Sequence, residues 1–163
     1  ILEDGEILQL GRQEWTVLIT PGHHPGHVCL LSDAGLIAGD MVAGIGTILI
    51  PPGTGDMDVY IEQLERLKAL EPHLMFPSHG PVIPLPEKTL DHYIKHRMER
   101  HQRVLDAVES GRKTVPEIST EAYANTPNAH PGLAQDQTIA HLLSHERAGR
   151  VQQTNKGWIR GDD

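Results

Sequence analysis

Histidines and an aspartate directly follow several short apolar runs of this sequence. The densest group is Thr20–His27, with the order Thr-Pro-Gly-His-His-Pro-Gly-His, in which glycines and prolines fix a loop from which imidazole rings project together. Asp40 and His79 each follow an apolar run with a glycine beside them. Imidazole nitrogens and carboxylate oxygens are ordinary ligands of zinc. His23, Asp40 and His79 are therefore candidate metal ligands, provided that the ends of these runs meet.

Short β-strands are predicted to position these residues. Apolar and β-branched residues between glycine and proline turns predict strands over residues 7–10, 14–20, 27–31, 35–39 and 74–77. Residues 59–70 repeat apolar side chains at helical spacing, with Asp58 available as the N-cap; helix capping is favoured for Asp56 and Asp58 over a place in a cleft. The alternation of strands and helix indicates a layered α+β or an α/β fold.

The composition and predicted elements change near residue 90. A long helix is predicted from Leu90 to just before Gly111, and Thr114 with Glu117 forms a capping box that opens a second helix. A third helix is predicted over 133–148, followed by a hairpin over 150–160. Three helices followed by a hairpin have the outline of a winged helix. We therefore expect two domains, 1–90 and 91–163.

Composition and charge exclude several classes of protein. The 163-residue chain is 38% hydrophobic and 22% charged, which is typical of a folded chain rather than a disordered one. No uncharged apolar run reaches the roughly 18 residues of a transmembrane helix. The single cysteine, Cys29, excludes an internal disulfide framework and favours a reducing, cytoplasmic location. The net charge of −8 lies in residues 1–90, and residues 91–163 are neutral, so neither part is a basic surface for nucleic acid.

Three motifs together resemble a known family. Thr-Pro-Gly-His-x-Pro-Gly-His at 20–27, Gly-Asp at 39–40 and Pro-x-His-Gly at 77–80 resemble, in this order, the later metal motifs of the metallo-β-lactamase-fold hydrolases. That family has a four-layered αββα sandwich. The C-terminal winged-helix outline makes the chain similar to the lactamase-beta-2-like branch, which includes a metal-dependent endoribonuclease.

The resemblance implies a role for each matched residue. His23 corresponds to a ligand of the first metal, Asp40 to the carboxylate that bridges two metals, and His79 to a ligand of the second metal. His27 matches a position that supports the ligands without binding metal. Two zinc ions held in this way would direct a hydroxide at an ester-type bond, which also makes Asp40 a catalytic residue.

The sequence departs from the family pattern in one large respect. The first metal motif of the family, His-x-His-x-Asp-His, is absent from these residues. Only three of about seven protein ligands are then present, whereas even a structural zinc site requires about four. The chain begins with Ile rather than Met. We therefore expect the C-terminal part of a longer hydrolase, which is inactive by itself.

The resemblance does not settle the substrate. His96 and Arg97 lie on the predicted long helix, where they either bind an anionic substrate or remain solvated charges. The winged-helix branch favours an RNA phosphodiester, while a small-molecule thioester or lactam stays open.

Two other classes of function are compatible with these elements. The first is a winged-helix regulator that binds nucleic acid, but the predicted third helix offers only Arg147 near its end, which argues against DNA binding. The second is a module without catalytic activity that dimerises, because a homo-oligomer would cover strand edges left unpaired.

Overall fold

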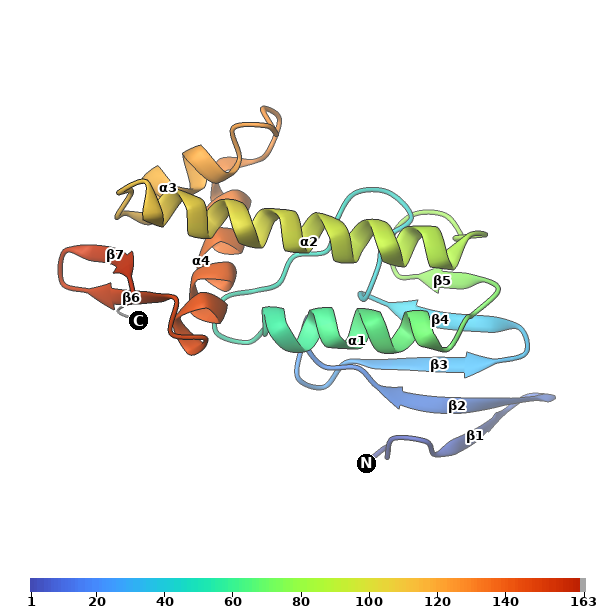
Figure 1. Ribbon diagram of the computed structural model, residues 1–163. Helices are drawn as coiled ribbons and strands as arrows, with labels where there is room; N and C mark the ends of the chain where they lie inside the picture. The colour runs from blue at the N-terminus through green and yellow to red at the C-terminus, as the bar shows by residue number, and fades with distance from the viewer. Residues whose placement is uncertain (162–163) are drawn as a thin grey trace.

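A five-stranded sheet forms one layer of the protein, and two helices cover one of its faces (Figure 1). The structure is a computed structural model that describes residues 1–161. The elements, in chain order, are β1 (Ile7–Leu10), β2 (Gln13–Ile19), β3 (Val28–Ser32), β4 (Gly35–Gly39), α1 (Met57–Ala69), β5 (Met75–Pro77), α2 (Pro86–Glu109), α3 (Val115–Ala122), α4 (Pro131–Arg147), β6 (Val151–Thr154) and β7 (Gly157–Arg160).

The strand directions bring three loops to one edge of the sheet. The strand order is β1-β2-β3-β4-β5; the first four strands are antiparallel to their neighbours, and β5, reached through α1, is parallel to β4. As a result β2, β4 and β5 run in the same direction. The segments that follow Ile19, Gly39 and Pro77 therefore all leave the sheet at the same edge.

The main hydrophobic core lies between the sheet and the two helices. Leu36 and Ala38 of β4 are fully buried against it, whereas Ile37 between them points to the other face and is 38% exposed. Strand alternation explains this difference. On that other face, Ile37 forms a shallow apolar hollow of about 510 Å³ with residues that include Trp15 and Phe76.

The N-cap of α1 differs from the prediction. Asp56, rather than Asp58, accepts the backbone N–H groups of residues 58 and 59, at 3.0 and 3.2 Å. Asp58 instead binds two residues of α4: it accepts the hydroxyl of Ser144, and its Oδ2 lies 2.7 Å from Nη2 of Arg147. Both aspartates fit the local capping signal, and both contact α4, since Oδ1 of Asp56 also lies 2.9 Å from Nη2 of Arg147.

The C-terminal part contains the predicted three helices and a hairpin, although α2 begins at Pro86 and not at Leu90. A second hydrophobic cluster joins Val104 and Val108 of α2 to Leu142 of α4 and to Trp158 of β7. The first half of α2 packs in the core of the sheet instead. Helix α2 therefore contributes to both hydrophobic clusters. The division into two domains and the winged-helix assignment stay predictions.

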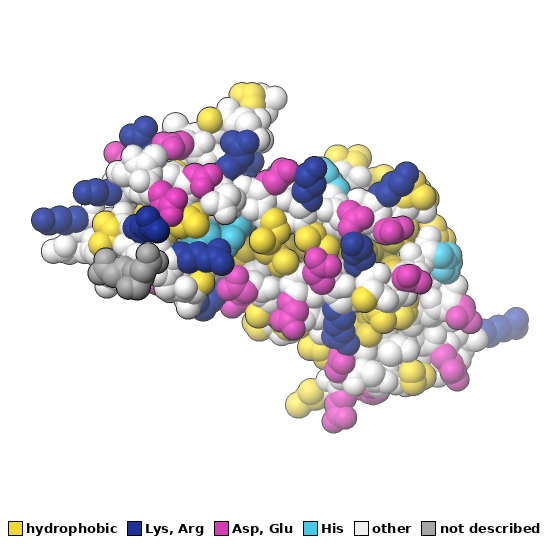
Figure 2. Space-filling view, in the orientation of Figure 1, with side chains coloured by type: hydrophobic (Ala, Val, Ile, Leu, Met, Phe, Trp, Pro, Cys, Tyr) yellow, Lys and Arg dark blue, Asp and Glu magenta, His cyan; other side chains and the backbone are white. Residues whose placement is uncertain are grey.

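Opposite charges are interspersed over the face of the molecule that carries α1 and α2 (Figure 2). Lys68 of α1, for example, lies 2.6 Å from Asp91 of α2. This face therefore presents no continuous basic surface. Among residues 1–161, no helix combines the length and the apolar character that a membrane crossing requires.

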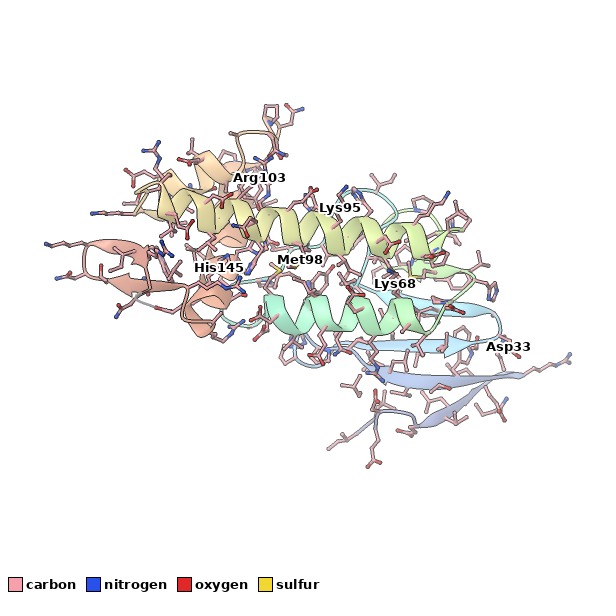
Figure 3. All side chains as sticks on the ribbon, viewed as in Figure 1. Asp33, Lys68, Lys95, Met98, Arg103 and His145 are labelled. Carbon is pink, nitrogen blue, oxygen red and sulfur yellow. The ribbon has the colours of Figure 1, made fainter. Side chains whose placement is uncertain are left out.

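Three histidines are buried where α2 contacts α4. Nδ1 of His101 lies 3.2 Å from Nδ1 of His141. Nε2 of His145, which Figure 3 labels, donates to the carbonyl oxygen of His101 at 2.9 Å. The rings of His101 and His145 stack, with their centroids 3.6 Å apart. Burial disfavours the charged rings: it lowers the pKa of His141 and lowers the pKa of His101 to about 4. These rings are therefore neutral at neutral pH.

The histidine cluster predicts a loss of stability in acid. As the pH falls from about 6.5 towards about 4, the unfolded chain binds a proton at residue 101 that the folded protein does not bind. The free energy of unfolding then falls by up to about 1.4 kcal/mol per pH unit for this histidine. Urea unfolding across this range should show a shallower dependence on pH for His101→Gln. His92→Gln, at an exposed position of the same helix, should keep the wild-type dependence. Equal slopes for all three proteins would contradict this assignment.

Candidate metal centre

The sheet edge at which the three loops meet brings the predicted ligands together. Nε2 of His23 lies 3.8 Å from Oδ2 of Asp40, and Nε2 of His79 lies 3.3 Å from Oδ1 of the same carboxylate. Asp40 therefore stands between the two imidazoles. The side chain of His23 is 24% exposed and that of His79 is 71% exposed, so the group faces outward at the edge of the sheet.

The ring of His23 is held in a defined orientation. Its Nδ1 lies 2.7 Å from the carbonyl oxygen of Leu49. Because a carbonyl oxygen only accepts hydrogen bonds, Nδ1 must carry the proton of this bond. In the neutral ring, Nε2 then carries a lone pair and faces the carboxylate of Asp40. Two electron-rich atoms thus face each other, an arrangement that attracts a cation.

The carboxylate of Asp40 also has an unused acceptor. Its Oδ1 atom is buried and receives no hydrogen bond, although Nε2 of His79 lies 3.3 Å away. A buried carboxylate oxygen without a donor is costly. Binding of a positive ion at this atom would remove that cost.

These observations define how far the residues fit a metal. The nitrogen and oxygen donors are of the type that zinc prefers, and the free Oδ1 of Asp40 is available for coordination. However, no group of three or more His, Cys, Asp or Glu residues within 1–161 is arranged so that it could hold a metal ion. His23, Asp40 and His79 therefore fit part of a metal site, and by themselves they do not complete one.

His27 supports this group without facing it. Its Nε2 accepts the backbone N–H of Asp40 at 3.0 Å, so its Nδ1 carries the proton and donates to Oγ1 of Thr20 at 2.8 Å. The Thr20 hydroxyl donates to Sγ of Cys29 at 3.3 Å, and this thiol donates to the carbonyl oxygen of Ala38 at 3.4 Å. Burial lowers the pKa of His27, which keeps the ring neutral. Both ring nitrogens are thereby engaged by protein atoms.

Two buried tyrosines hold the loop that follows Asp40. The hydroxyl of Tyr60 in α1 donates to the carbonyl oxygen of Met41 at 2.7 Å. The hydroxyl of Tyr93 in α2 accepts the N–H of Ala43 at 2.9 Å and contacts the carbonyl oxygen of Gly46 at 3.1 Å. The sequence analysis did not predict these contacts. A buried tyrosine hydroxyl needs a hydrogen-bond partner, and this rule was the signal that could have indicated the contacts.

The two residues of the predicted substrate pair lie in different surroundings. Arg97 is 2% exposed, and its guanidinium binds Oγ1 of Thr47, the carbonyl oxygen of Ile48 and Oε1 of Gln137. It therefore points into the protein rather than towards an external anion. His96 is half-buried and lines a hollow of about 140 Å³ beside Thr47, and burial lowers its pKa. Substrate binding by His96 stays a prediction.

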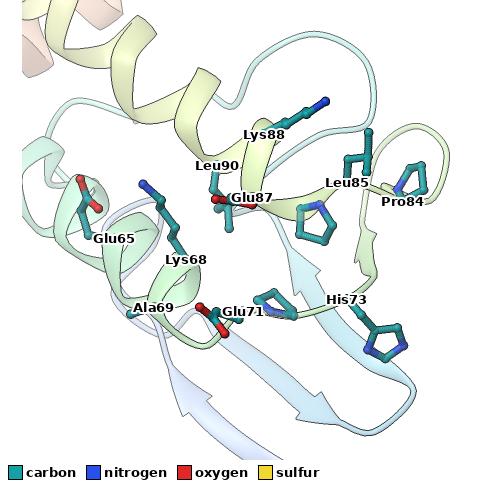
Figure 4. A pocket seen from close by; sticks show the side chains of 12 residues that line it. Glu65, Lys68, Ala69, Glu71, His73, Pro84, Leu85, Glu87, Lys88 and Leu90 are labelled. Carbon is teal, nitrogen blue, oxygen red and sulfur yellow. The ribbon is translucent and has the colours of Figure 1, made fainter.

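A hollow of about 650 Å³ lies elsewhere, between the end of α1 and the start of α2 (Figure 4). Its lining includes side chains of both charges, such as Glu65, Lys68 and Lys88. None of the site residues predicted from the sequence lines it. The candidate metal centre is therefore separate from this hollow.

Gly39 allows His27 and Asp40 to approach each other, which gives a prediction. Its φ is +53°, and a Cβ atom at this position would lie 2.5 Å from Nε2 of His27. Gly39→Ala should therefore lower the free energy of unfolding in denaturant by about 1–3 kcal/mol more than Gly5→Ala. Gly5 has a φ of +81° with nothing near its Cβ position, so it controls for backbone strain alone. Equal losses in the two variants would show that the contact with His27 is unimportant.

The sequence and the structure both match known proteins. Residues 1–79 match the family described as the metallo-beta-lactamase superfamily. The beta-lactamase-like protein 2 homolog of Drosophila melanogaster is 32% identical over 141 residues, which cover 83% of this chain and 47% of that protein. An atrochrysone carboxyl ACP thioesterase of Aspergillus fumigatus is 28% identical over 109 residues, which cover 66% of this chain and 33% of the thioesterase.

A solved structure shows the same fold. A metallo-beta-lactamase family protein of Thermus thermophilus superposes with a TM-score of 0.82 at 24% identity, covering 98% of this chain and 53% of that protein. The chain thus spans about half the length of this structure and less than half of the two relatives. The mixed α+β architecture that was predicted is confirmed. The similarity to the metallo-beta-lactamase superfamily therefore covers residues 1–79 of the chain.

Proposed function

We propose that the protein containing this chain is a metal-dependent hydrolase of the metallo-beta-lactamase superfamily. His23, Asp40 and His79 would hold two zinc ions together with ligands from residues beyond this chain. The observation that carries the proposal is that Nε2 of His23 lies 3.8 Å from Oδ2 of Asp40, beside a buried Oδ1 without a donor. The three residues alone leave the site incomplete, so the isolated chain would be inactive.

Each residue of the group has a distinct task in this proposal. Bound zinc would supply a Lewis acid and a hydroxide nucleophile for an ester-type bond. Asp40 would hold metal together with both histidines, since one of its oxygens faces His23 and the other faces His79. His27 holds the backbone of Asp40 in place through its N–H, and its neutral ring adds no positive charge beside the metal.

The substrate class rests on resemblance. The winged-helix outline of the C-terminal part supports an RNA phosphodiester, for which His96 is a candidate contact at the hollow beside Thr47. A thioester is the second candidate, because the Aspergillus fumigatus relative is named as a thioesterase. Binding of duplex DNA is not part of the proposal, since α4 offers few basic residues for phosphates.

Two further parts of the proposal concern location and assembly. The unpaired and buried Cys29 supports a reducing, cytoplasmic environment. The apolar hollow formed with Trp15, Ile37 and Phe76 supports burial of this face against further chain or a second copy.

Asp40→Ala in the longer protein tests the proposed function. The variant should lose bound metal, measured by elemental analysis, and its hydrolysis rate should fall more than about 100-fold. The substrates to compare are a single-stranded RNA oligonucleotide, an acyl thioester and a β-lactam.

Asp33→Ala is the matched control for this experiment. Asp33 is an exposed aspartate in the β3–β4 turn, and this variant should keep both metal and activity (Figure 3). A wild-type protein without stoichiometric metal, or full metal retention in Asp40→Ala, would refute the hydrolase proposal.

A further inference from the structure

We propose that Arg97 and Gln137 are positioning residues that set the orientation of His23 through the segment 47–50. Their helices, α2 and α4, belong mainly to the C-terminal part of the chain, yet their side chains reach the backbone beside the candidate metal centre. The inference rests on the proposed function only in that His23 acts there as a metal ligand.

Gln137 binds the backbone of Ile50 in the manner of a neighbouring strand. Its Oε1 accepts the N–H of Ile50 at 3.2 Å, and its Nε2 donates to the carbonyl oxygen of Ile50 at 2.9 Å. The side chain of Gln137 is buried, with 7% exposure. Both backbone groups of Ile50 are thus fixed by a single side chain of α4.

Arg97 fixes the other end of the same segment and joins it to Gln137. Its Nη1 donates to Oε1 of Gln137 at 2.8 Å, while its Nη2 donates to Oγ1 of Thr47 at 3.1 Å and to the carbonyl oxygen of Ile48. The guanidinium also lies 5.4 Å from the ring centroid of Tyr60. Residues 47, 48 and 50 are therefore all held from the side of α2 and α4.

Leu49, between these fixed residues, makes the contact that matters for the centre. Its carbonyl oxygen accepts the Nδ1–H of His23 at 2.7 Å. A carbonyl in this role selects the ring tautomer and aims the other nitrogen, here Nε2, at its ligand. If the segment were free to rotate, this hydrogen bond would be lost intermittently and the tautomers of His23 would mix.

Gln137→Leu in the 163-residue chain tests this inference without requiring any metal. A long-range ¹H–¹⁵N spectrum of the His23 ring, recorded above the titration range of histidine, should show the Nδ1–H tautomer in the wild-type chain. The leucine variant should show mixed tautomers, with about tenfold faster amide hydrogen exchange at Ile50. Gln135→Leu, at a neighbouring position of α4, should behave as the wild-type chain does.

A conservative variant separates positioning from packing. Gln137→Glu keeps the acceptor for Arg97 and for the N–H of Ile50 but loses the donor to the carbonyl oxygen of Ile50, so it should keep the wild-type tautomer of His23 more fully than the leucine variant does. If Gln137 served only to fill space, the apolar leucine would be tolerated better than a buried carboxylate. Should the leucine variant not fold, Thr47→Val removes one partner of Arg97 at an exposed position and should mix the tautomers to a smaller degree.

The outcomes distinguish this inference from the proposed function. An unchanged His23 tautomer in folded Gln137→Leu, or in Thr47→Val where the leucine variant does not fold, would overturn the positioning role, even if the longer protein binds zinc. Mixed tautomers in a protein that binds no zinc would support the positioning role and refute the hydrolase proposal.

Discussion

The common direction of β2, β4 and β5 is the constraint on which the candidate centre depends. Two antiparallel steps, from β2 to β3 and from β3 to β4, restore the original direction of the chain, and the crossover through α1 makes β5 parallel to β4. The backbone therefore delivers three loops to one edge before any side chain is considered. The histidine and carboxylate groups need only lie in the loops that follow these strands, and His23, Asp40 and His79 do so.

The parts of this arrangement that follow local rules were predictable from the sequence. Apolar runs between glycine and proline indicate the strands, and the position of Asp40 and His79 directly after such runs indicates the shared edge. Contacts between distant segments were not predictable in this way. Gln137 binds Ile50 across 87 positions of sequence, and neither residue carries a local signature of that contact. Arg147 of α4 likewise binds both Asp56 and Asp58, which lie 91 and 89 positions away in the sequence, and no local pattern predicts these contacts.

Histidine serves two opposite purposes in this protein, and the surroundings decide which one applies. At the sheet edge, His23 keeps a nitrogen directed at a carboxylate in a partly exposed position, which favours a bound cation. Between α2 and α4, His101 and His141 contact each other in the interior of the protein. Burial lowers the pKa of His141, and the charges of Arg97 and Arg100 lower it further. The same side chain is thus a candidate ligand in one place and a neutral packing element in the other.

The series of hydrogen bonds from His27 through Thr20 and Cys29 ends at the carbonyl oxygen of Ala38. It contains the only cysteine of the sequence, which can therefore report on the opening of the sheet. Burial raises the pKa of the Cys29 thiol to about 11, and the side chain has no exposed surface. A soluble alkylating reagent can reach this sulfur only when β3 separates from its neighbours. The rate of its modification therefore measures how often the sheet opens, and the native chain carries this chemical reporter without any added label.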